Sequence, residues 1–112
     1  MTAPKLIETS PGKYSLLLNA NTTAVDAVVE DLGHEPNGYF WAGVARLLVS
    51  TEAPALEGRF SYDPEAGMFC AYGTDRGALE SLSKLLTAVA TDAEQARKVV
   101  ALAKAKGIDL DD

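Results

Sequence analysis

Two turn sequences constrain the fold of this chain more than any other feature, because each lies between short runs of strand-forming residues. The first, SPGK at residues 10–13, places proline before glycine, which suits the centre of a type II turn. It separates strand candidates at residues 5–8 and 14–19. The second, DPEAG at residues 63–67, combines Asp and Pro with a glycine for which we expect positive φ. The sequence therefore predicts two β-hairpins.

Alternation along these strands assigns side chains to the two faces of a sheet. Leu16 and Leu18 fall on one face of the second strand and Leu17 falls on the other, so we expect both faces to be covered. In the second hairpin, Cys70 and Tyr72 share a face.

Elsewhere the apolar spacing is that of helices. An amphipathic stripe predicts a helix from about Thr22 to Leu32. Asn37 can cap a second helix, which carries one arginine as its only charge and is therefore expected to lie centrally. Within it, Gly43 would permit a neighbouring backbone to come close.

Two further helices are expected near the C-terminus. The first has an apolar stripe from Leu79 to Val89, and TDAE at residues 91–94 is a capping box that starts the second. Gly107 ends it, and Ile108 is placed for the hydrophobic contact that often follows a glycine cap. Together these elements predict an α+β fold in which two β-hairpins form an antiparallel sheet packed by about four helices.

The 112 residues suffice for a single domain, residues 1–112, with 47% hydrophobic residues to form its core. No run approaches the roughly 18 apolar residues of a membrane span, so we expect no membrane partner. The opening residues lack a secretory apolar run, and the single cysteine allows no internal disulfide. Both observations favour the cytoplasm.

Charge points away from nucleic acid as a direct partner. Sixteen acids and ten bases leave a net charge of -6, whereas phosphate binding calls for a basic surface. Acids also gather where a helix disfavours them: Glu30 and Asp31 end the first helix, and Glu35 follows. A surface that attracts a basic protein would explain this placement, but the residues alone favour an ordinary solvated acidic face.

No group of residues predicts catalysis or a cofactor. His34 and Cys70 could form a base and nucleophile, but no glycine-rich elbow surrounds the cysteine. Asp31, His34 and Glu35 lack the spacing of a metal site. Asp63 and Glu65 are explained by turn formation. We therefore expect a protein that is not an enzyme and that has no metal or cofactor.

The aromatic residues at the start of the second helix are expected to differ in role. Trp41 lies on an apolar helix and is expected to be in the core. Tyr39 projects from another face, with Arg46, which suits the rim of an interface.

Two segments carry a family resemblance: NGYFW at residues 37–41 followed by GVA at 43–45, and DPEAGMFCAYG at residues 63–73. With the closing Gly107-Ile108 and the acids after it, the chain resembles the immunity protein 51 family of bacterial polymorphic toxin systems. This resemblance implies a cytosolic antitoxin that binds a secreted toxin domain and blocks it. It implies no enzymatic activity and supplies no catalytic residues.

A cognate toxin domain, expected to be basic, is thus the predicted partner. The expected partner-binding residues are Glu30, Asp31, His34, Glu35, Tyr39, Asp63 and Glu65. Two alternatives remain open. One is a small enzyme or ligand-binding domain with a pocket between the aromatic hairpin and the central helix, using Tyr62, Tyr72 or Cys70. The other is a homo-oligomer that extends its sheet at a hairpin edge, so monomer and homodimer both remain possible.

Overall fold

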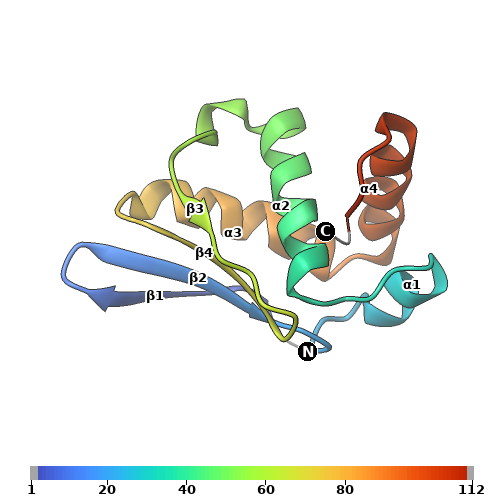
Figure 1. Cartoon of the computed structure of the whole chain (residues 1–112), viewed down its shortest axis with the longest axis horizontal. Coiled ribbons are helices and arrows are strands. Elements are labelled where there is room, and N and C mark those ends of the chain that lie inside the picture. Colours follow the sequence, from blue (N-terminus) through green and yellow to red (C-terminus); the bar gives the residue numbers. More distant parts are fainter. Residues whose placement is uncertain (1–2, 111–112) are drawn as a thin grey trace.

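The computed structural model describes residues 3–110 as a four-stranded antiparallel sheet with helices packed on one side (Figure 1). The strand order is β1-β2-β4-β3. This confirms the predicted α+β fold. In chain order the elements are β1 (Lys5–Ser10), β2 (Lys13–Asn19), α1 (Asp26–Asp31), α2 (Gly38–Glu52), a 3-10 turn η1 (Pro54–Leu56), β3 (Ser61–Tyr62), β4 (Met68–Gly73), α3 (Arg76–Ala90) and α4 (Ala93–Lys106).

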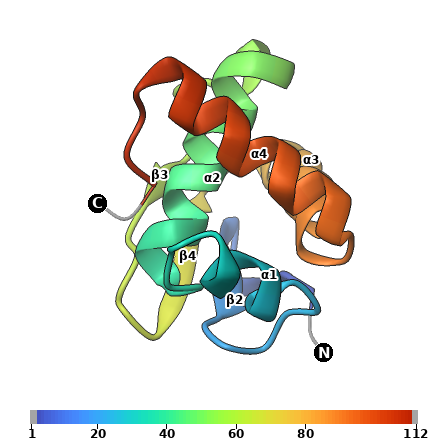
Figure 2. The ribbon, with the colours of Figure 1, turned by 90° about the vertical axis from the view of Figure 1, so that its right-hand side faces the viewer.

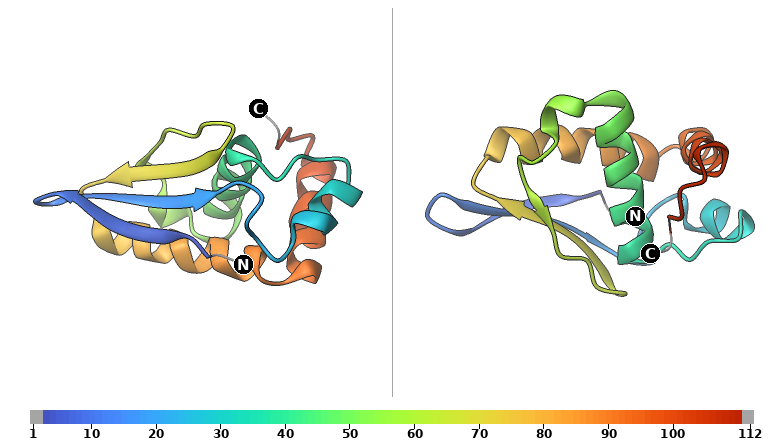
Figure 3. Two further views of the ribbon diagram at one scale, coloured as in Figure 1. Left: turned by 90° about the horizontal axis from the view of Figure 1, so that it is seen from below. Right: turned by 45° about the horizontal axis from the view of Figure 1, so that its top comes forward.

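The two faces of the sheet have different surroundings. On the inner face, Leu16 and Leu18 of β2 and Phe69 of β4 are buried beneath α2 and α3. On the outer face, Leu17 is half-buried and Tyr72 is 46% exposed. No helix of residues 3–110 packs against this outer face, which the left view of Figure 3 shows from below. The expectation that both faces are covered is therefore wrong.

Helix α2 passes through the centre of the molecule, as its apolar sequence predicts. The Asn37 side chain accepts a hydrogen bond from the Phe40 N–H at 2.9 Å, which confirms the predicted cap. Gly43 also has the predicted role, since a Cβ there would lie 2.9 Å from the carbonyl oxygen of Leu110. The C-terminal segment therefore packs directly on this helix, through a fully buried Leu110.

Helix α1 is shorter than predicted and begins at Asp26 instead of Thr22. The threonines that precede the helix make local hydrogen bonds through their side chains. The Thr23 hydroxyl donates to the Asp26 carboxylate and accepts from the Val25 N–H. These bonds offer the backbone an alternative to the helix, which therefore starts late.

Helix α4 begins one residue later than the capping box implies. Asp92, and not Thr91, is the cap, and its carboxylate accepts from the N–H groups of Glu94 and Gln95. At the other end Gly107 adopts φ 69°, as expected of a glycine cap. Ile108 nevertheless stays 41% exposed, and the buried contact is made by Leu110.

Candidate protein-binding surface

The loop before α2 and the turn between β3 and β4 meet at Gly38. The Gly38 N–H donates a 3.1 Å hydrogen bond to the carbonyl oxygen of Ala66. A Cβ on Gly38 would lie 1.9 Å from the carbonyl oxygen of Glu65, so only glycine fits without moving the turn. The loop that follows α1 and the β3–β4 turn, which carry the two groups of predicted binding residues, are therefore joined at this point; in Figure 2, α1 faces the viewer and the turn lies to its lower left.

Three of the predicted acids lie on α1 and the loop that follows it. Glu30, Asp31 and Glu35 are exposed, and the last turn of α1 contains no base. The ion pairs within residues 3–110 are Arg59–Asp75 and Arg76–Glu80, so none involves these three acids. Their negative charge is therefore presented to solvent without a paired cation from the described part of the chain.

Asp63 and Glu65 add two more exposed acids from the β3–β4 turn. Backbone bonds alone hold this turn: the Asp63 N–H donates to Cys70, and Glu65 exchanges two bonds with Met68. The turn is also tied to β2, because the Ala20 N–H donates to Gly67. Gly67 itself does not adopt the predicted positive φ. The carboxylates are thus carried on a fixed backbone.

The aromatic residues beside these acids divide between core and surface. Trp41 is fully buried, as predicted, and its indole Nε1 has no hydrogen-bond partner among residues 3–110. Tyr39 is 38% exposed, and its position at the rim of an interface stays a prediction. His34 is half-buried, with its ring centre 5.7 Å from that of Phe40. The histidine is therefore partly a packing residue and less exposed than the neighbouring acids.

The surroundings of Cys70 raise the pKa of its thiol and so disfavour the thiolate. Partial burial raises the pKa of the Cys70 thiol, and the negative charges of Asp63 and Glu65 raise it further. A side-chain hydrogen bond from Ser15 lowers this pKa and so opposes part of the change. A nucleophilic cysteine needs the opposite environment, one that lowers the pKa. Within residues 3–110, no three His, Cys, Asp or Glu side chains gather into a group able to hold a metal.

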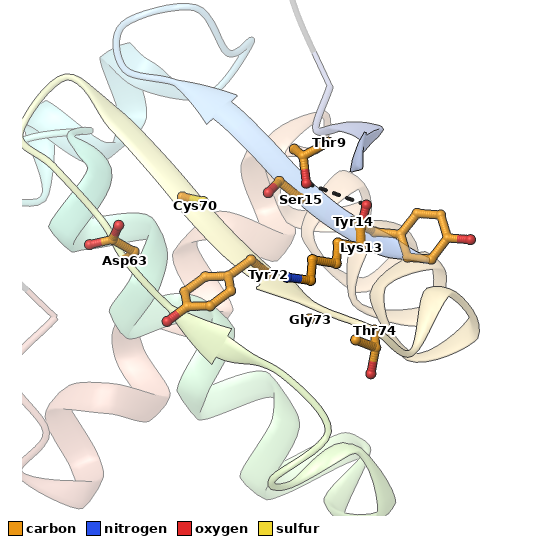
Figure 4. Close-up of a pocket in the computed structure, with 9 residues that line it drawn as sticks. All are labelled: Thr9, Lys13, Tyr14, Ser15, Asp63, Cys70, Tyr72, Gly73 and Thr74. Carbon is orange, nitrogen blue, oxygen red and sulfur yellow. Dashed lines mark hydrogen bonds between the residues drawn. The ribbon is translucent and has the colours of Figure 1, made fainter. Parts of the chain in front are cut away.

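A shallow groove of about 490 Å³ lies on the outer face of the sheet (Figure 4). Its lining includes Lys13, Ser15, Asp63, Cys70 and Tyr72. This is not the predicted location between the aromatic hairpin and the central helix. There Tyr62 packs beneath the Arg46 guanidinium, whose carbon lies 4.8 Å from the ring centre. Burial raises the pKa of Tyr62 to about 12, although the Arg46 charge opposes that change.

The chain belongs to the family described as Immunity protein 51, whose family model matches residues 5–105. The match spans all seven predicted binding residues and both turn sequences. Neither a curated protein nor a solved structure matches the chain. Among residues 3–110, no helix has both the length and the apolar character required to cross a bilayer.

Proposed function

We propose that this protein is a cytoplasmic antitoxin that neutralises a cognate secreted toxin domain by binding it directly. The observation that carries the proposal is membership of an immunity-protein family over residues 5–105. Immunity of this kind needs no chemistry from the antitoxin, because occupying the toxin's surface suffices. The raised pKa of the Cys70 thiol, which disfavours a nucleophilic thiolate, is compatible with a binding role.

The acidic end is the surface we propose for this contact. Glu30, Asp31 and Glu35 lie on α1 and its loop, while Asp63 and Glu65 lie on the turn that Gly38 holds against that loop. Exposed acids speed the encounter with a basic partner, and a partly exposed tyrosine such as Tyr39 is a common interface anchor. His34 completes the set from its half-buried position beside Phe40.

Co-expression tests the function itself. The toxin to test is the C-terminal domain of any long secreted protein that proves to be encoded beside this chain. We expect growth to be lost when that domain is expressed alone and restored when this chain is expressed with it. A purified complex should also form from the two proteins without added cofactor. Failure to restore growth, with both proteins folded and present, would exclude this toxin as the partner.

A further inference from the structure

The register of the sheet arranges the outer-face side chains in rows that cross the strands. In one row, Lys5 of β1 pairs with Leu17 of β2, which pairs with Cys70 of β4. The Asp63 N–H donates to the carbonyl oxygen of Cys70 and continues that row beyond β3. A base at one edge of the sheet and an acid at the other therefore stand at the same level along the strands.

The other charged residues of this face follow the same division. Lys13 begins β2 opposite Ser10 of β1, whereas Glu65 is paired with Met68 at the start of β4. Both bases and both acids are exposed. The β1–β2 half of the face is thus positive and the β3–β4 half is negative.

Between these charges the face is largely apolar. Tyr72 is the most exposed of the central side chains, and its ring lies across the groove in Figure 4. The half-buried residues around it are the apolar Ile7, Leu17, Met68 and Cys70, together with Ser15, which pairs with Tyr72 across the strands. An apolar centre with charged margins is the usual composition of a protein interface.

Symmetry identifies the occupant that this pattern fits. Two such faces can pack together about a two-fold axis that lies between them and runs along the strands. This operation places β1 over β3 of the partner subunit and keeps each level along the strands, so Lys5 faces Asp63 of the partner subunit. An axis running across the strands would instead bring positive edge to positive edge.

We propose that the chain forms a weak homodimer through the outer face of its sheet, with Lys5 of each copy paired with Asp63 of the other. The two bases and two acids of the face sum to zero charge, whereas Glu30, Asp31 and Glu35 lie outside it and keep their negative charge for a basic toxin. The interface differs from an extension of the sheet at its edges, because it pairs faces and leaves β1 an edge strand.

The size of the face sets the strength of the dimer. Strands β1, β2 and β4 are each about 20 Å long, whereas β3 has only 2 residues; at a spacing of about 4.8 Å they cover roughly 300 Å². A standard interface buries about 800 Å² on each partner, so this dimer belongs to the weak, transient class. We therefore expect association at concentrations on the order of 100 µM.

Sedimentation velocity of the purified chain, from about 10 µM to about 1 mM, tests the proposal. We expect the mean mass to rise towards that of a dimer. Lys5→Glu and Asp63→Lys should each weaken dimerisation about tenfold, because two like-charge contacts replace two ion pairs. The double variant should restore it, since each reversed charge again faces its opposite. Lys84→Glu, on the exposed side of α3, is the matched control and should change nothing.

A chain that remains monomeric at about 1 mM would overturn the proposal. So would a double variant that dimerises no better than the single ones. If the chain stays monomeric at about 1 mM and Tyr72→Lys abolishes toxin binding, the face belongs to the toxin and not to a second copy. These measurements of self-association use no toxin, so their failure leaves the proposed antitoxin function standing.

Discussion

The Gly38 N–H donates to the carbonyl oxygen of Ala66 at 3.1 Å, and this bond joins the start of α2 to the β3–β4 turn. The contact is so close that a Cβ on Gly38 would lie 1.9 Å from one backbone oxygen and 2.3 Å from another. The relative position of the acids on the two segments therefore depends on residue 38 being glycine, which has no side chain to hold the turn away.

Replacing Gly38 by alanine should destabilise the protein by about 3 kcal/mol, because the turn backbone must move to admit a methyl group. Urea unfolding measures the change. Gly67→Ala is the matched control in the same turn, since a Cβ there meets nothing within 4 Å. We expect that variant to stay within about 1 kcal/mol of the parent. Equal losses in both variants would show that the close approach at Gly38 is unimportant.

Reversing the charges of Glu30 and Asp31 to lysine should slow association with the cognate toxin about tenfold and flatten its salt dependence. Stopped-flow or surface-based kinetics would measure both quantities. The same change puts bases at the C-terminal end of α1, which favours the folded state, so slower binding would not reflect unfolding.

Glu52→Lys is the control for that experiment, because Glu52 is an exposed acid at the other end of α2. It changes the net charge in the same direction and leaves the acidic end intact. Association rates that fall equally per charge in both variants would assign the effect to net charge and not to this surface.

Tyr62 should make the protein less stable as the pH rises from 10.0 towards 12. The folded state keeps the phenol proton until pH about 12, whereas the unfolded chain releases it near 10.0. Between these values the unfolded state binds fewer protons, so the free energy of unfolding falls with pH; below 10.0 the residue contributes no slope.

Denaturant unfolding at several pH values, in the parent and in Tyr62→Phe, isolates this contribution. The variant keeps the other tyrosines and most of the ring packing, so the difference between the two slopes belongs to the Tyr62 hydroxyl. Parallel slopes above pH 10.0 would contradict the raised pKa.

Local sequence signals predicted the parts of the fold that depend on neighbouring residues. The Asn37 cap, the glycine end of α4 and the two hairpin turns each arise from chemistry within about four residues. The start of α4 was misplaced by one residue because Thr91 and Asp92 are both good caps, and only the structure shows that the carboxylate is used.

Features of the fold that depend on contacts between residues far apart in the chain could not be predicted from local sequence patterns. The strand order β1-β2-β4-β3 brings together strands separated by about fifty residues of chain, and no local pattern encodes that pairing. The uncovered outer face was missed for the same reason, because Leu17 has the same alternating environment in sequence whether or not a helix lies over it. Both groups of candidate acids were predicted, but their junction at Gly38 was not.

Leu110 is buried against Gly43, so the packed core of the protein extends beyond the residues that the family model matches. The family match stops at residue 105, five positions before this leucine. A chain that ended at residue 105 would lack Leu110, and the surface of α2 around Gly43 would then be exposed to solvent. Anyone trimming the chain for crystallisation should therefore cut no closer than the residues that follow Leu110.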